Sequence, residues 1–532
     1  MKKALVLLLA AALVILVMAA GTSAQEADEW SQFQKDAGNT GSIDVAIPGD
    51  NTVSNKTAAM DARAGSQPAV SGNRAYVYNG VDDTSGSIAC FDLSTHQKVW
   101  EKTIDPPTNW TFSSPTVSGG VVYIGSGSKV HALNAADGAA LWTRDLATLA
   151  AGASIANCSP TVVGNHLFIG DWQNGIYYCL DVADSGNKVW SFQLDAGSHA
   201  QSTPAVDGDR VFVGQFSDPA GSNGKVWCLD RSDGKPVASW GTNGCFETAN
   251  KLDVTGSVAV DGDYIYFTDY DFNSADSHLY CVGKADGKEA WQGSVYPTSG
   301  TPAVGDGIVV SAGDDFHTTF TPRVSAFAAG AGSGGAAAPL WTADGFGGWK
   351  MSPSIADGKV AVGIDVWGAP GVAVLDATDG GVVWQSTEGN STPVPTAYGL
   401  LSISAAGELV TFGAGAVANG DFYFAEGTTR DGYQEWICLE NPGATQIDAN
   451  IQYMLTDGSV RDQPVMLPAD SRTTVDVNLF LGLGVDASAH VTGNGYFVAE
   501  RSMYVDTETV SGGEQVMGVT DPGKSFLFAE GT

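Results

Sequence analysis

The clearest candidates for a chemical role in the sequence are the oxygen-bearing side chains of one short stretch. A calcium ion binds about six to eight oxygen ligands, so carboxylates and an amide that converge from one tight loop suit it. The EF-hand pattern is not met, because Ser274 and Tyr280 replace its glycine and its bidentate glutamate. We therefore regard this stretch as a calcium candidate. Its proposed ligands are Asp269, Asp271, Asn273 and Asp276.

Catalytic motifs do not accompany this stretch. The sequence contains neither GxSxG nor HExxH, which removes the motif-based case for a serine hydrolase or a zinc peptidase. The seven histidines are dispersed without the spacing of metal ligands. The seven cysteines include no CxxC, no CxxCH and no adjacent pair, so thioredoxin-like, c-type haem and zinc motifs are missing. We assign no catalytic residue.

Four of the cysteines share one position of the repeat described below: Cys90, Cys179, Cys228 and Cys281. A small, buried residue at a tightly packed strand position is the favoured interpretation. The alternative in an exported chain is a disulfide, either Cys228 with Cys245 or Cys158 with Cys179. The odd number of cysteines leaves at least one free thiol in either case.

The elements that must position these residues are best seen between Ser114 and Trp142. Pro115 can open a strand, and Val121–Ile124 forms a second, mostly β-branched strand after a Gly-Gly turn. A third strand at Lys129–Asn134 leads through an Asp-Gly turn to a fourth that ends on Trp142. This is a four-stranded antiparallel unit of about 45 residues, the size of a propeller blade. One such sheet cannot bury both faces, so it needs neighbours.

The unit recurs along the chain. Eight stretches of the type Ser/Thr-Pro-x-Val or a close variant predict eight strand openings, beginning at 67, 114, 159, 203, 257, 301, 352 and 392. Tryptophans close seven of the units, while the eighth runs into Phe412 without one. We expect the N-terminal segment to supply the outer strand of the eighth unit, with Trp30 as its tryptophan. The seven closing residues are Trp100, Trp142, Trp190, Trp240, Trp291, Trp341 and Trp384.

The pattern SPxV, VYxGS, DGxxxW, together with WxQFxxDAGNTG from Trp30, resembles the PQQ-type propeller repeat of quinoprotein dehydrogenases and BamB-like envelope proteins. The resemblance covers residues 30–413 and implies an all-β fold, an eight-bladed β-propeller of four-stranded antiparallel blades. It is weak evidence for function, because such families range from redox enzymes to scaffolds. Quinoprotein dehydrogenases stack their cofactor beside an adjacent cysteine pair. This chain has none, which argues against bound PQQ and leaves calcium as the cofactor to test.

Loops that leave each second strand or enter each first strand share one face of a propeller, the ligand face. Here they are acidic and aromatic, which suits a bound cation, a sugar-bound ion or a basic peptide. The alternative is that the aspartates fill turns by bonding their own backbone. The candidates are Asp82, Asp83, Trp110, Asp171, Trp172, His199, Asp218, Asp314, Asp315, His317, Trp349, Asp365 and Trp367.

A change of periodicity marks a second domain. We expect a linker at 414–420 and a small β-sandwich at 421–532, where apolar and polar residues alternate. The segment FAEGT occurs at 424–428 and again at 528–532, which suggests either a truncated tandem repeat or a last strand that closes the sheet of the first copy. The domain resembles sandwich modules of secreted bacterial surface proteins.

The N-terminus predicts export. Residues 1–24 combine two lysines, an apolar run and small residues up to Ala24, which is typical of a signal peptide. An uncleaved anchor is the alternative, and no later stretch is apolar enough to span a membrane. The net charge of −33 makes nucleic acid and anionic lipid poor partners. We expect a secreted or cell-surface protein, with the periplasm as the other location.

Three functions remain for such a chain. The first is a non-enzymatic binding or scaffold protein that holds an extracellular or envelope protein, or a glycan, on the propeller loops. The second is a PQQ- and calcium-dependent oxidoreductase. The third is a BamB-like scaffold for envelope assembly, against which the missing lipidation cysteine and the second domain argue. We adopt the first.

Overall fold

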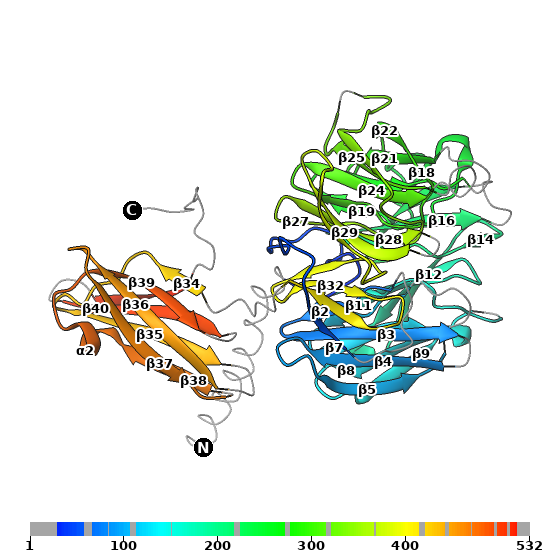
Figure 1. The fold of residues 1–532 in the computed structure, drawn as a ribbon. Helices are drawn as coiled ribbons and strands as arrows, with labels where there is room; N and C mark the ends of the chain where they lie inside the picture. Colours follow the sequence, from blue (N-terminus) through cyan, green and yellow to red (C-terminus); the bar gives the residue numbers. More distant parts are fainter. Residues whose placement is uncertain are drawn as a thin grey trace, which may run out of the picture. The chain divides into compact units, whose positions relative to one another are not determined.

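The computed structural model describes residues 29–57, 66–82, 85–106, 113–150, 152–217, 224–271, 277–314, 321–332, 334–366, 369–413, 421–441, 446–469, 471–493, 497–507 and 511–518. The chain divides into two compact units, one up to Gly415 and one from Ala416 (Figure 1). The predicted signal peptide lies outside the described residues. Within them, no helix has the length and apolar character needed to cross a membrane.

Eight antiparallel sheets follow one another among the described residues of the first unit. Sheet 1 contains β2 (Ala69–Ser71), β3 (Arg74–Asp82), β4 (Ser85–Asp92) and β5 (Lys98–Ile104). Sheet 2 contains β6 (Thr116–Ser118), β7 (Val121–Ser126), β8 (Lys129–Asn134) and β9 (Ala140–Asp145). Sheet 3 contains β10 (Thr161–Val163), β11 (His166–Asp171), β12 (Ile176–Asp181) and β13 (Asn187–Gln193). Sheet 4 contains β14 (Ser198–His199), β15 (Ala205–Asp207), β16 (Arg210–Ser217), β17 (Lys225–Asp230) and β18 (Cys245–Glu247).

The remaining sheets of this unit have the same pattern. Sheet 5 contains β19 (Ala259–Asp261), β20 (Tyr264–Thr268), β21 (Ser277–Gly283) and β22 (Glu289–Val295). Sheet 6 contains β23 (Ala303–Gly305), β24 (Ile308–Asp314), β25 (Pro322–Ala328) and β26 (Trp341–Asp344). Sheet 7 contains β27 (Ser354–Ala356), β28 (Lys359–Val366), β29 (Ala369–Asp376) and β30 (Val382–Ser386). Sheet 8 contains β31 (Val394–Thr396), β32 (Gly399–Ile403), β33 (Leu409–Phe412) and, from the N-terminal region, β1 (Val53–Lys56).

The sheets close into a ring. Buried side chains form a core between each pair of successive sheets, for example Tyr78 of sheet 1 with Ile124 of sheet 2. The last core joins sheets 7, 8 and 1 through Val374, Leu400 and Val77. Figure 1 accordingly shows the yellow β32 beside the blue β2. The short strands β2, β6, β10, β15, β19, β23 and β27 contact one another in turn, so they line the centre of the ring. The expected all-β propeller fold is therefore confirmed.

The closing tryptophans connect each sheet to the next. The indole N–H of Trp291 donates to the carbonyl of Gly330 at 2.8 Å, and Trp341 reaches Ala377 in the same way. The turn glycine of the following sheet lies against the ring: a Cβ on Gly332, whose φ is +57°, would sit 2.7 Å from the Trp291 indole. The glycine therefore allows a left-handed turn and leaves room for the indole. Matching pairs are Trp100–Gly138, Trp142–Gly186, Trp190–Gly234, Trp240–Gly287 and Trp341–Gly380.

Trp30 does not close sheet 8, contrary to the expectation from the sequence. The N-terminal region does supply the outer strand, but this strand is β1, which pairs Val53 with Phe412 and contains no tryptophan. Trp30 instead lies at the inner strand of sheet 1, where its carbonyl accepts the N–H of Val70 at 2.8 Å. Its indole donates to Gln67 Oε1 at 2.7 Å.

The second unit contains two four-stranded sheets. Its one described helix is α2 (Val477–Leu481), capped by Asp476 Oδ1, which accepts the Leu479 N–H at 3.0 Å. A single core contains residues of both sheets, among them Phe424, Ile451 and Leu439. The first sheet has the order β34 (Asp421–Phe424), β39 (Ala487–Gly493), β36 (Ile447–Leu455), β37 (Val460–Leu467). The second has the order β38 (Ser471–Asp476), β35 (Tyr433–Asn441), β40 (Val498–Asp506), β41 (Ser511–Met517). The second FAEGT segment lies outside the described residues.

Candidate functional site

The centre of the propeller is occupied by residues 30–43, which we call the axial belt. Its backbone carbonyls accept the N–H of the second residue of the inner strand in six sheets. In sheet 3 the side chain of Gln32 does this instead, with Oε1 2.8 Å from the Val162 N–H and Nε2 3.2 Å from its carbonyl. The belt thus bonds seven sheets in chain order. The six carbonyl contacts are Trp30–Val70, Ser31–Val117, Ala37–Val206, Gly38–Val260, Thr40–Val304 and Gly41–Ile355, at 2.6–2.8 Å.

Polar side chains of the belt stabilise its conformation. Asp36 Oδ1 accepts the N–H groups of Gly38 and Thr40 at 3.1 Å, and its Oδ2 accepts the Thr40 hydroxyl at 2.7 Å. The fully buried Asn39 donates to the carbonyls of Thr203 and Val258 in sheets 4 and 5. Sequence reasoning missed this role. The signal available was a cluster of Asp, Gly, Asn and Thr residues outside any repeat unit.

The hydroxyl groups of the repeated Ser/Thr-Pro motif connect neighbouring sheets. Each accepts the backbone N–H of the corresponding residue in the preceding sheet. This role explains why serine or threonine opens the repeat, because a bonded hydroxyl satisfies an otherwise buried N–H. The contacts are Gln67 N to Ser114 Oγ, Ser114 N to Ser159 Oγ, Ser159 N to Thr203 Oγ1, Thr203 N to Ser257 Oγ, Ser257 N to Thr301 Oγ1, Thr301 N to Ser352 Oγ and Ser352 N to Thr392 Oγ1, at 2.8–3.2 Å.

A small hollow of about 20 Å³, the axial hollow, opens above the belt. Phe33 of the belt lines it, together with five hydroxyl residues, one amide and Lys350. The described part of this lining contains no carboxylate, whereas the sequence predicts loops on this face that are acidic and aromatic. The residues are Phe33, Gln201, Thr203, Thr255, Ser257, Ser299, Lys350 and Ser352.

Two predicted ligand-face residues come together beside sheets 3 and 4. The rings of Trp172 and His199 stack with centroids 4.0 Å apart and planes 9° apart. His199 Nδ1 lies 2.9 Å from the Trp172 carbonyl. Phe216 adds a third ring, whose centroid lies 5.3 Å from that of His199. Trp349 and Lys350 form a second pair, with the Lys350 ammonium 4.3 Å from the centroid of the indole ring. The described part of the face therefore offers flat aromatic contact area.

The described carboxylates of the ligand face are used by the fold. Asp171 is fully buried, and its oxygens accept the Ile155 N–H at 3.0 Å and the Asn174 amide at 2.7 Å. Asp269 is also fully buried, and burial raises its pKa. Its oxygens accept the N–H of His278 at 2.6 Å and the hydroxyl of Tyr280 at 2.8 Å, both on β21. Asp171 bonds partly to its own turn, through Asn174, whereas Asp269 bonds across to the neighbouring strand β21.

The calcium candidate therefore has little support from its described half. Asp269 bonds within its own sheet, and the Asp271 N–H donates to Ser277 Oγ at 3.1 Å. Among the described residues, no three His, Cys, Asp or Glu side chains are placed to hold a metal ion together. Asp314 is buried at the end of β24. The candidates Asp83, Trp110, Asp218, Asn273, Asp276, Asp315, His317 and Trp367, and the side chains of Asp82 and Asp365, lie outside what the structure describes.

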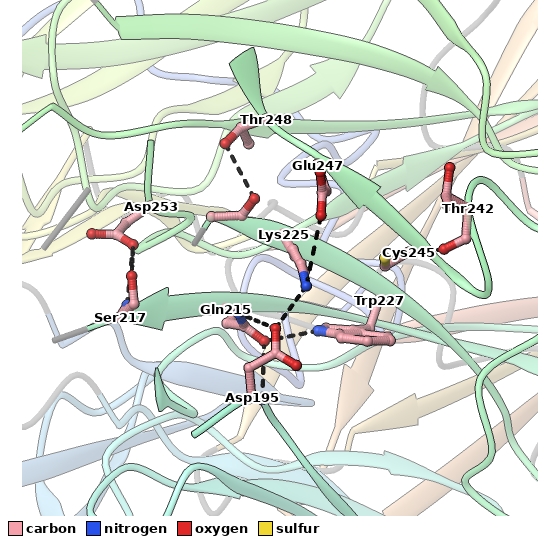
Figure 2. Close-up of polar contacts among 11 residues, drawn as sticks. Asp195, Gln215, Ser217, Lys225, Trp227, Thr242, Cys245, Glu247, Thr248 and Asp253 are labelled. Atoms are coloured by element: carbon pink, nitrogen blue, oxygen red, sulfur yellow. Dashed lines mark hydrogen bonds and ion pairs between the residues drawn. The ribbon is translucent and has the colours of Figure 1, made fainter. Parts of the chain in front are cut away.

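A polar cluster that sequence reasoning missed lies at the loop end of sheet 4 (Figure 2). The Lys225 ammonium is 2.7 Å from Asp195 Oδ2 and 3.8 Å from Glu247 Oε1. Gln215 donates to Asp195 at 3.2 Å and accepts the indole N–H of Trp227 at 3.0 Å. The lysine is thus neutralised between two carboxylates. The cluster ties the ends of three strands together and contains no activated nucleophile.

The seven cysteines are all free and buried, so neither proposed disulfide is present. Burial raises the pKa of Cys90 and of Cys158 to about 12. Thiolate is the reactive form of cysteine, so these side chains are inert at neutral pH.

One motif match escaped the sequence reasoning. Residues 518–525 read GVTDPGKS and fit the phosphate-binding spacing GxxxxGK[ST]. That motif works between a strand and a helix of an α/β unit, whereas the described part of this unit consists of two β-sheets. All of its residues except Gly518 lie outside the described ranges, so it carries no argument here.

Comparisons with known proteins agree with this geometry. A family model described as outer membrane protein assembly factor BamB matches residues 84–273. BamB of Yersinia pestis is 30% identical over 208 residues, which is 36% of this chain and 49% of that protein. BamB of Moranella endobia (strain PCIT) is 27% identical over 242 residues, or 42% and 56% of the two chains. The chain therefore spans about half the length of these curated relatives.

Solved structures share the fold at lower identity. BamB from Moraxella catarrhalis superposes with a TM-score of 0.50 at 19% identity, over 67% of this chain and 98% of that one. A quinohemoprotein alcohol dehydrogenase from Comamonas testosteroni superposes with a TM-score of 0.55 at 13% identity, over 73% and 77% of the two chains. Both likenesses concern the fold alone.

Proposed function

Since the chain is a PQQ-type β-propeller protein, we propose that it is an exported, non-enzymatic binding protein that holds an envelope or extracellular protein on the loop face of the propeller. The observation that carries this proposal is the use of the described polar groups. The carboxylates of Asp171 and Asp269 bond within their own sheets, and the described lining of the axial hollow consists of hydroxyls, an amide, a lysine and Phe33. What remains on the described part of this face is contact surface.

The described lining of the hollow gives no support to a quinone held with calcium. Calcium requires converging carboxylate or carbonyl oxygens, and the described lining of the hollow has no carboxylate to supply. The belt also places Phe33 in the hollow. We therefore derive no redox step for this chain.

A role in envelope assembly is the second candidate. The curated relatives are outer membrane protein assembly factors, and the family model matched is the one described for them. This supports a protein rather than a glycan as the partner, and an envelope location for the chain. The relatives match only part of this chain, so we keep assembly as the narrower form of the proposed function.

Two experiments test the proposal. In the first, the photo-crosslinking amino acid p-benzoylphenylalanine replaces Trp172, which lies on the loop face. In a control variant it replaces Asp209, which lies in the turn between the first and second strands of sheet 4, at the end of the sheet away from the loop face. We expect a defined protein adduct from position 172 and none from position 209. Equal adducts from both positions would contradict a loop-face partner.

The second experiment tests the enzymatic alternative. The purified mature chain is titrated calorimetrically with calcium and then with PQQ, and reduction of an artificial dye by alcohols and sugars is followed. We expect no dye reduction. Stoichiometric uptake of PQQ with dye reduction would overturn the non-enzymatic proposal.

A further inference from the structure

The axial hollow differs in charge from the rest of the protein. The chain has a net charge of −33, from 59 acidic and 26 basic residues. The described lining of the hollow contains one charged residue, Lys350, and it is a cation. The one charged group in the described lining is therefore an ammonium, which also lies 4.3 Å from the centroid of the Trp349 indole ring.

The hydroxyls of the hollow are held as hydrogen-bond donors. Thr203, Ser257 and Ser352 each accept a backbone N–H from the preceding sheet, at 3.2, 2.8 and 2.9 Å. A hydroxyl that accepts such a bond still carries its own hydrogen, and that hydrogen is left for another acceptor. Because the backbone fixes these oxygens, the donors are arranged before any ligand arrives. Fixed donors around a cation favour an anionic acceptor.

The rest of the lining sets the shape of the ligand. Ser299 Oγ lies 3.1 Å from Thr255 Oγ1, and the Gln201 amide donates to the Thr255 carbonyl at 3.1 Å, so this wall is internally bonded. Phe33 of the axial belt adds an apolar surface. The belt bonds seven sheets at the centre of the ring, so the hollow admits the end of a ligand and not a chain that passes through.

We propose that the axial hollow binds a carboxylate group of the partner protein, with Lys350 as its counter-ion and the hydroxyls of Thr203, Ser257 and Ser352 as its donors. This inference rests on the proposed function, because it assigns the chemistry of the partner at the same face. The carboxylate belongs either to the last residue of a chain or to an acidic side chain, and both present the same two oxygens. An apolar stem next to the carboxylate contacts Phe33.

Three short peptides separate these sources by calorimetric titration of the full mature chain. The first is acetyl-Ala-Ala-Phe with a free carboxylate, the second is its C-terminal amide, and the third is acetyl-Ala-Glu-Phe amide. We expect the first to bind and the second not to bind. Binding of the third as well extends the site to acidic side chains, whereas failure of the third restricts it to chain ends.

The variant Lys350→Met tests the counter-ion. We expect affinity for the free-carboxylate peptide to fall about tenfold, and the binding of the wild-type protein to weaken as salt is raised. Lys288→Met is the matched control, because this lysine is exposed on a turn and paired with Asp286, and it should bind like the wild type. Ser299→Ala, which removes one hydroxyl of the lining, should weaken binding by a smaller factor. Thermal unfolding of each variant checks that it is folded.

The proposal fails if the amide binds as tightly as the acid, or if Lys350→Met binds like the wild type. It also fails if none of the peptides binds. Because a crosslinked adduct at Trp172 does not depend on Lys350, a failure of the peptide experiment with a surviving adduct removes the carboxylate site and leaves the binding function in place. Loss of both removes the proposed function itself.

Discussion

Sheet 8 differs from the other seven sheets of the propeller at the positions where the ring is joined. Its outer strand β1 comes from the N-terminal region, whereas every other sheet takes its outer strand from the adjacent chain. It has Pro395 where the other sheets have Val or Ile bonded by N–H to the belt. It also has no closing tryptophan, and sheet 1 correspondingly has His96, with φ of +58°, in place of the turn glycine. Departures from the repeat thus mark the seam of the ring.

The seam also coincides with the two ends of the axial belt. The belt starts at sheet 1 with Trp30 and ends at sheet 7, where the Ile43 N–H donates to the Ile355 carbonyl at 3.1 Å. Sheet 8 therefore lies at the gap of the belt. A proline has no N–H to leave unbonded, so Pro395 suits this one place.

The largest difference in the free energy of unfolding should be between a proline placed in the ring and the proline removed from the seam. Val304→Pro removes the N–H that donates to the Thr40 carbonyl at 2.7 Å, and we expect the free energy of unfolding to fall by about 3 kcal/mol. Pro395→Val at the seam adds an N–H that no belt carbonyl accepts, and should cost less, about 1–2 kcal/mol. Urea unfolding monitored by tryptophan fluorescence measures both. Equal losses would show that the belt does not discriminate between the sheets.

A substitution in the turn that packs against the indole should cause an intermediate loss of stability. A Cβ on Gly234 would sit 2.4 Å from the Trp190 ring and occupy a φ of +71°, so Gly234→Ala should cost about 2 kcal/mol. In sheet 1, His96 occupies the position of the turn glycine. No indole packs on it from the preceding sheet 8, because the outer strand β1 of that sheet contains no tryptophan. His96→Gly should therefore change stability by less than about 1 kcal/mol. Thermal unfolding of the pair is the measurement. A large loss in His96→Gly would contradict the assignment of the seam.

The hydroxyl contacts should have the smallest effect. Thr301→Val keeps the shape of the side chain but removes the acceptor of the Ser257 N–H, which lies 3.2 Å away. We expect a loss of about 1 kcal/mol in urea unfolding. A loss close to that of Val304→Pro would mean that the hydroxyls, rather than the belt, hold the inner strands together.

The sequence predicted the sheets well, because their determinants are side chains at fixed spacing. A turn glycine followed by a closing tryptophan recurs in most units, for example in DGAALW at 137–142 and DGKEAW at 286–291, and this pattern is visible without a structure. The same holds for Trp172 and His199, which were placed on one face by their positions in the repeat and do stack.

The belt was missed because its partners have no signature in the sequence. Its carbonyls bond to backbone N–H groups, and any valine provides one. The position of Trp30 was wrong for a similar reason: a tryptophan outside the repeats can pack at the outer or the inner strand, and spacing does not distinguish them. The carboxylates of Asp171 and Asp269 were assigned to a ligand because a sequence does not show whether an oxygen faces solvent or its own loop.

The closure of sheet 8 has a consequence for the order of folding. Leu409 donates to Thr57 Oγ1 across a separation of 352 residues, and the belt needs the inner strands of seven sheets before its carbonyls are bonded. Contacts between such distant residues carry the largest loop-closure entropy and form late. The first part of the propeller to be synthesised is thus the last to reach its final place, and the ring stays open until its eighth sheet exists.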